Sequence, residues 1–74
     1  MRITESARRH GVEDDDMRHA LRNRVRAYAA QGDHELLMVI GPSRTGVMLE
    51  IGVDDDEEDP RIVHAMKARS KFWP

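Results

Sequence analysis

The gaps between the apolar segments that follow Asn23 constrain the fold of this 74-residue chain more than any other feature. The apolar residues of these segments follow the pattern of strands, and the gaps contain the Gly, Pro, Asp and Ser residues typical of turns. Each gap is too short for a parallel crossover, which needs about a dozen residues or more. The pattern therefore predicts a meander of four antiparallel strands, over residues 25–30, 36–40, 47–53 and 61–67.

The N-terminal third of the chain is predicted to be helical. Thr4 is a favourable N-cap and Gly11 a favourable helix stop, which predicts a short first helix between them. The four acids at residues 13–16 suit the start of a second helix, whose apolar stripe begins at Met17. We therefore expect one α+β domain over residues 1–74, in which two helices pack on a four-stranded antiparallel sheet. The other sheet face is expected to be polar or covered by a partner.

The core is expected to be thin, because only 4% of the residues are aromatic. Cysteine is absent, which excludes disulfides and thiolate metal sites, and the histidines lack the spacing of a zinc helix. We therefore expect no metal and no other cofactor. Small domains commonly gain stability from oligomerisation, so a homo- or hetero-oligomer is expected. Phe72 and Trp73, two aromatic residues at an otherwise polar end, are the predicted partner-binding residues.

Charge is distributed unevenly along the chain. The formal net charge is −2, but residues 54–59 are six consecutive acids, and without them 12 bases face 8 acids, or +4. Such an acidic block repels itself, which predicts a solvated loop between the last two strands. The rest of the chain is basic enough to favour contact with phosphates.

No apolar run approaches the ~18–20 residues that a membrane span needs. The first residues also lack the apolar stretch of a secretory signal, so the cytoplasm is the expected location.

Three short motifs occur in a fixed order along the chain. They are RHGV at residues 9–12, IGPSRTGVML at residues 40–49 and RIVHA at residues 61–65. Together with the acid-rich helix expected after the first motif, they resemble the BrnT family of bacterial toxins. The resemblance extends over roughly residues 7–69. The main evidence for it is that the motifs occur in the same order as in the family.

The resemblance implies a RelE-like fold and metal-independent RNA cleavage that inhibits translation. It also implies an antitoxin of the BrnA type as the protein partner and RNA as a second partner. By position, Arg9 and His10 match the basic-histidine pair of the family, and Lys67 matches one of its closing basic positions. Two departures are expected: the chain starts almost directly at the first helix, without the N-terminal strand of the family, and Met66 stands where an arginine is usual.

Metal-free RNA cleavage needs groups that remove and supply protons, and cations that stabilise the phosphorane. Histidine suits the proton transfers because it changes charge near neutral pH. The predicted catalytic residues are Arg9, His10, His64 and Lys67, and the predicted RNA-binding residues are Arg44 and Arg69. His64 shares strand parity with Ile62 and Met66, so it is buried and structural if that face is the one against the helices.

Two other functions stay open beside the toxin. Met66, the missing N-terminal strand and the thin core favour a non-catalytic toxin-like module that is bound by an antitoxin or associates with itself. A DNA-binding protein is the third hypothesis, because the RHGV motif followed by a helix is similar to a helix-turn-helix. However, the acids at residues 13–16 occupy the helix start that a DNA reader places against the groove.

Overall fold

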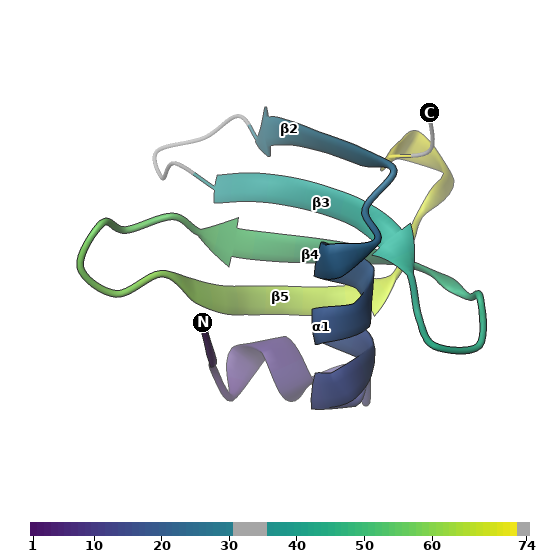
Figure 1. The fold of residues 1–74 in the computed structure, drawn as a ribbon, viewed down its shortest axis with the longest axis horizontal. Helices are drawn as coiled ribbons and strands as arrows, with labels where there is room; N and C mark the ends of the chain where they lie inside the picture. Colours follow the sequence, from purple (N-terminus) through teal and green to yellow (C-terminus); the bar gives the residue numbers. More distant parts are fainter. Residues whose placement is uncertain (31–35, 73–74) are drawn as a thin grey trace.

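The computed structural model describes residues 1–30 and 36–72 (Figure 1). Five strands form one sheet in the order β1-β5-β4-β3-β2, and one α-helix lies across one of its faces. In chain order the elements are β1 (Arg2–Ile3), the 3-10 helix η1 (Ser6–Arg8), α1 (Asp14–Arg22), β2 (Arg26–Ala30), β3 (Leu36–Pro42), β4 (Met48–Asp54), β5 (Arg61–Lys67) and the 3-10 helix η2 (Ser70–Phe72). No helix in the described ranges is long and apolar enough to cross a membrane.

The predicted fold class, two helices on a four-stranded antiparallel sheet, is wrong. Strands β2 to β5 do follow one another as antiparallel neighbours, but β1 adds a fifth strand that runs parallel to β5. The register pairs Arg2 with Arg61 and Ile3 with Ile62. Short connections exclude parallel pairing only between strands that follow one another in sequence. β1 and β5 are joined by most of the chain, so that argument does not apply to them.

The predicted first helix is also wrong, because the segment forms only the three residues of η1. Two hydroxyl groups hold this segment against the edge of the sheet. Thr4 Oγ1 donates a hydrogen bond to the carbonyl oxygen of Ile62 at 2.9 Å, and Ser6 Oγ donates one to Val63 at 2.8 Å. Hydroxyl side chains that bond elsewhere compete with helix formation. The segment therefore follows β5 instead of extending as a helix.

Helix α1 begins among the acids, as predicted, and packs on β3 and β4. Met17 and Ala20 are its fully buried residues. Gly41 on β3 lets the helix approach closely, because a Cβ atom there would lie 2.2 Å from the carbonyl oxygen of Ala20. Only a residue without a side chain allows this contact.

The main core lies between α1, η1 and the sheet. Alternate residues of β4 point into it, as the two-residue period predicts. Its buried members are Ile3, Ala7, Met17, Ala20, Val39, Leu49, Ile51, Val53, Ile62 and Ala65.

The opposite sheet face is covered in part by the chain itself, which corrects the expectation of a polar or partner-covered face. After β5 the C-terminal segment crosses the sheet on the side away from α1 (Figure 1). Met38, Ile40 and Glu50, which share this face by register, are all buried. The sequence pattern predicted no element of the chain to cover this face, because the residues after the last strand were not assigned to a helix or strand.

The acidic block forms most of the connection between β4 and β5 and is largely exposed, as predicted. Its two ends are bound by arginines: Asp54 pairs with Arg61 at 2.8 Å, and Asp59 pairs with Arg2. These pairs attach the loop to the start of β5 and to β1. The predicted turn at residues 31–34 lies outside the described residues.

Candidate functional site

A β-bulge in β5 decides where His64 points. Register pairs Val53 with Ile62 and Gly52 with His64, so Val63 has no partner of its own on β4. Ile62 therefore faces the main core, whereas His64 lies across Gly52 on the other face. The prediction that His64 shares a face with Ile62 is wrong, because the extra residue reverses the alternation. Bulges of this kind often occur next to functional sites and re-aim side chains there.

His64 binds a buried carboxylate. Its Nε2 lies 2.8 Å from Oε2 of Glu50, whose side chain is completely buried. Arg69 supplies the remaining donors to the same carboxylate. Its backbone N and its Nε reach Oε1 at 3.0 Å each, and its terminal nitrogen reaches Oε2 at 2.8 Å.

The hydrogen bonds keep Glu50 ionised despite its burial. Burial alone would raise the pKa of Glu50, but the hydrogen bonds from Arg69 and His64 outweigh it and lower the pKa to about 2. The same contact with Glu50 raises the pKa of Arg69. A carboxylate in this state only accepts hydrogen bonds, so it presents a fixed negative charge to His64 at neutral pH.

His10 lies beside His64. The two ring centroids are 6.0 Å apart, with the rings inclined at 74° in an edge-on arrangement. His10 is an exposed residue in the connection between η1 and α1, where Gly11 makes the turn with a φ of 76°. Arg8 stabilises that connection by two hydrogen bonds to Asp14 at 3.0 and 2.8 Å. Residues from opposite ends of the chain therefore meet in one place.

The other predicted site residues lie apart from this pair or are engaged differently. Lys67 is exposed and pairs with Leu49, so by register it belongs to the α1 side of the sheet and not to the face of His64. Arg9 is exposed, and its side chain forms no ion pair or hydrogen bond within the part of the chain that the structure describes. Arg69 is beside His64 but directs its guanidinium to Glu50.

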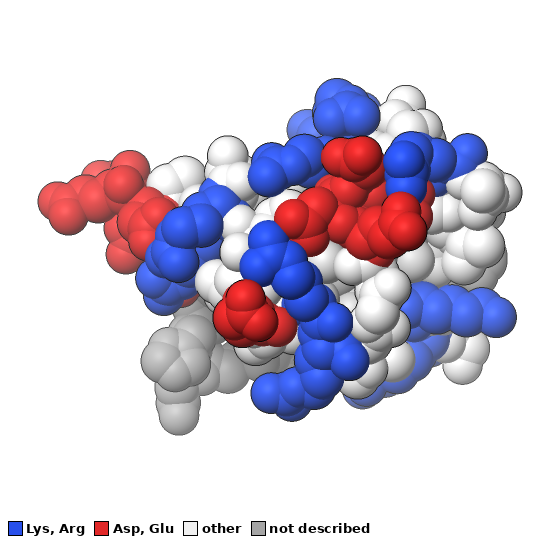
Figure 2. Space-filling model, turned by 90° about the horizontal axis from the view of Figure 1, so that it is seen from below, with Lys and Arg blue, Asp and Glu red and all other residues white. Residues whose placement is uncertain are grey.

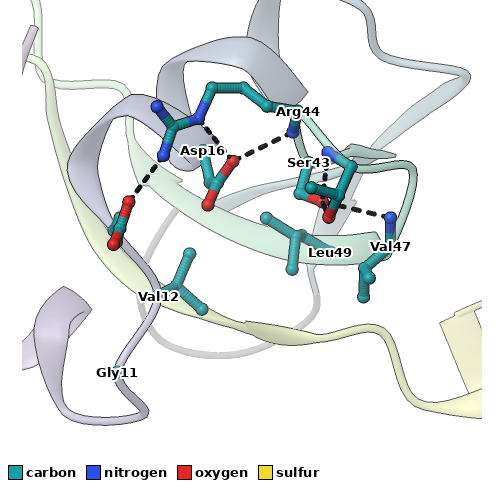
Figure 3. Close-up of a pocket in the computed structure, with 9 residues that line it drawn as sticks. Gly11, Val12, Asp16, Ser43, Arg44, Val47 and Leu49 are labelled. Atoms are coloured by element: carbon teal, nitrogen blue, oxygen red, sulfur yellow. Dashed lines mark hydrogen bonds and ion pairs between the residues drawn. The ribbon is translucent and has the colours of Figure 1, made fainter.

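Arg44 lies at an open pocket of about 650 Å³ on the α1 side of the molecule (Figure 3). Its backbone N and its Nε both donate to Oδ1 of Asp16 at 2.9 Å, and its terminal nitrogen pairs with Glu13. These contacts raise the pKa of Arg44, and the contact with Arg44 lowers that of Asp16. Arg44 thus ties the turn after β3 to the start of α1 and is already surrounded by carboxylates.

The turn itself closes the pocket on the other side. Ser43 is buried, and its Oγ accepts hydrogen bonds from the backbone N atoms of Thr45 and Val47 at 3.3 and 3.1 Å. Leu49 forms part of the apolar floor. This arrangement explains the turn motif by local structure, because the Ser43 hydroxyl is used by the turn.

Acidic and basic side chains alternate over the face that contains η1 and the start of α1. Figure 2 shows red and blue groups side by side there, with the acidic loop projecting at one end. The predicted +4 body therefore does not appear on this face as one continuous basic surface. Pairs such as Arg8 with Asp14 and Arg44 with Asp16 account for the alternation.

Phe72 ends η2, and Trp73 lies outside the described residues, so the predicted partner-binding role stays a prediction. Within residues 1–30 and 36–72 no group of three or more His, Cys, Asp or Glu side chains could hold a metal ion.

Glu50 is the residue of this site that the sequence analysis missed. One signal was present, since Glu50 is the one acid inside the apolar strand of residues 47–53. An acid in such a position needs a buried partner. The partner could not be identified from the strand pattern, because the bulge reverses the direction of His64.

Comparison of the chain with models of known protein families, with curated proteins and with solved structures gave no match.

Proposed function

We propose that this chain is an RNA-cleaving, toxin-like protein of the BrnT kind, with His10 and His64 as the groups that move protons. The observation that supports the proposal most is the 6.0 Å separation of the two rings. Each ring is close enough to the other for one phosphodiester group to lie within about 3 Å of both. One of the two is held by an ionised carboxylate, and the other is exposed.

In the proposed reaction the neutral His64 ring accepts the proton of a ribose 2′-hydroxyl, and the 2′-oxygen attacks the adjacent phosphorus. The bond from phosphorus to the 5′-oxygen of the next nucleotide breaks, and protonated His10 supplies the proton to that oxygen. The products are a 2′,3′-cyclic phosphate and a free 5′-hydroxyl. Arg9, exposed beside His10 in sequence, is the proposed cation for the phosphorane.

Strand β1 also supports the likeness to the BrnT family. The sequence analysis expected the chain to lack the N-terminal strand of that family. Arg2–Ile3 is nevertheless a strand, and it pairs with the last strand of the sheet. Of the two expected departures from the family pattern, the missing N-terminal strand is therefore no longer a difference. The other departure, Met66 in place of an arginine, remains.

A non-catalytic module bound by an antitoxin is the second candidate, and the ion pairs favour it. Arg44 and Arg69, the two predicted RNA-binding residues, both direct their guanidinium groups to carboxylates of the same chain. Met66, which stands where an arginine is usual in the family, adds no charge. A protein that has kept the fold of the toxin and lost its RNA contacts would present this pattern.

The test is cleavage of a labelled single-stranded RNA by the purified chain in the presence of EDTA. We expect a cyclic phosphate product, and a fall in rate of about 10²-fold to 10⁴-fold for His10→Ala and for His64→Ala. His19→Ala is the matched control, because His19 hydrogen-bonds to Pro42 from α1 and has no role in the reaction. Circular dichroism verifies the folding of each variant.

Growth after induced expression separates the two candidates. A catalytic toxin arrests growth, and the product of the adjacent gene relieves the arrest. Absence of RNA cleavage together with normal growth contradicts the catalytic proposal and favours the module. Equal cleavage by the wild type and both histidine variants also removes His10 and His64 from the mechanism.

A further inference from the structure

All hydrogen-bond acceptor positions of the Glu50 carboxylate are occupied. An ionised carboxylate offers about four lone-pair sites to hydrogen-bond donors. Here two donors of Arg69 fill Oε1, while a third donor of Arg69 and Nε2 of His64 fill Oε2. Three of these four donors are N–H groups of Arg69, which cannot accept a proton. Glu50 is thus fixed as an acceptor on all sides.

The proton in the contact between His64 and Glu50 must therefore belong to the histidine. A neutral imidazole carries one N–H and one lone pair. With the N–H at Nε2, the lone pair lies at Nδ1. Within the described residues, the His64 ring makes no hydrogen bond other than the one to Glu50. Nδ1 is consequently the nitrogen that can exchange a proton with a bound molecule.

Gly52 supplies an independent observation that the ring position is specific. A Cβ atom at Gly52 would lie 3.0 Å from Cβ of His64, closer than ordinary van der Waals contact. The absence of a side chain there leaves room for His64 on the face that it shares with Glu50. An alanine at this position would push the imidazole away from its present place.

We propose that Glu50 is a positioning residue, which holds the His64 ring in one orientation and in the Nε2–H tautomer so that Nδ1 is its proton acceptor. The inference rests on the proposed function in naming the RNA 2′-hydroxyl as the source of that proton. Glu50 itself does not touch the substrate, because its side chain is completely buried.

The test is the tautomer of His64, measured by long-range ¹H–¹⁵N NMR correlations of the imidazole at a pH where the ring is neutral. We expect the wild type to show a single Nε2–H form. In Glu50→Gln the amide can donate as well as accept, so the Nδ1–H form should appear. Glu50→Asp keeps an acceptor and should retain the Nε2–H form. Asp54→Asn is the matched control, since it removes a carboxylate from β4 that binds Arg61 and not His64.

A merely structural role for Glu50 predicts a different result. In that case Glu50→Gln changes the stability and leaves the tautomer at Nε2–H, which overturns the proposal, as does a wild-type ring found with its proton on Nδ1. If Glu50→Gln fails to fold, Gly52→Ala replaces it, because it displaces the ring and keeps the carboxylate. It should also yield a mixture of tautomers, and an unchanged Nε2–H form contradicts the inference.

RNA cleavage by the same variants then tests separately whether the orientation of His64 by Glu50 matters for the reaction. We expect Glu50→Gln to lower kcat by at least about 10-fold, with about 10⁴-fold as the upper end, and to leave KM unchanged. An unchanged kcat in a variant whose tautomer has shifted refutes the positioning role. A wild type that has the predicted tautomer but cleaves no RNA refutes the proposed function and leaves the geometry of Glu50 and His64 established.

Discussion

Replacing Gly41 with alanine is the most direct test of how α1 sits on the sheet. The added Cβ would lie 2.2 Å from the carbonyl oxygen of Ala20 and 3.1 Å from Cα of Arg24. Both contacts are with backbone, so no side chain can turn away to relieve them. Ordinary contact begins at 3.4 Å, so the C-terminal end of α1 must move out by about 1.2 Å.

The cost of that movement can be set against the stability of a domain of this size. Overpacking of a core typically costs about 1–3 kcal/mol, occasionally more. We expect a loss of about 3 kcal/mol, at the upper end, because the obstacle is the backbone of a helix whose Met17 and Ala20 are fully buried. A 74-residue chain has a free energy of unfolding of roughly 4–11 kcal/mol. Gly41→Ala should therefore remove a large part of it.

The assay is urea unfolding followed by circular dichroism. With a slope of about 1 kcal/mol per molar, the midpoint of Gly41→Ala should fall by about 3 M. Gly46→Ala is the control, because Gly46 has a φ of 89° and no atom within 4 Å of the added Cβ. It should lose only about 1–2 kcal/mol, the cost of left-handed backbone. If Gly41→Ala is as stable as Gly46→Ala or more so, the close approach does not constrain the fold.

Three further predictions concern Glu50, the hydroxyl contact of η1 with β5, and the ion pairs at the start of α1. The lowered pKa of Glu50, about 2 against 4.5 in the unfolded chain, contributes about 3 kcal/mol above pH 5, which is lost as the pH falls toward 2. Urea unfolding from pH 7 to pH 3 should show about 2 kcal/mol of this loss in the wild type and a smaller loss in Glu50→Gln, and parallel curves contradict it. Ser6→Ala should cost about 1 kcal/mol through its lost bond to Val63, measured by the same unfolding assay, and no change at all would show that this bond is not needed. Arg44→Ala should lower the midpoint at low salt only, because its ion pairs are exposed and screened, and a difference that persists in 1 M NaCl would argue against a purely electrostatic contribution.

The four longer strands could be predicted because their signals are local. The alternation in residues 47–53 is typical of a strand, and Leu49, Ile51 and Val53, which share one face of β4, all lie in the main core. The start of α1 among the acids is equally local. Such features depend on neighbours in the sequence, and a period of two residues or a favourable helix start reveals them.

The features that were missed depend on contacts between distant residues. Ile3 reads as an isolated apolar residue, and only pairing with Ile62 makes it part of a strand. Thr4 has the properties of a helix cap, but its hydroxyl bonds to β5. The bulge at Val63 has no sequence signature, and it alone decides that His64 meets Glu50. The catalytic candidates could therefore be proposed from the sequence, whereas the carboxylate behind one of them could not.

The parallel pairing of β1 with β5 has a consequence for how the protein is made. Arg2 finds its partner at Arg61, so the first strand stays unpaired until synthesis has passed residue 61. At about 5–20 residues per second, synthesis of 60 residues takes about 3–12 s. During that time η1 has no β5 to bind, and His10 has no second histidine beside it. The site is therefore absent until β5 has left the ribosome, and whatever chemistry the site performs begins only after that strand is free to pair with β1.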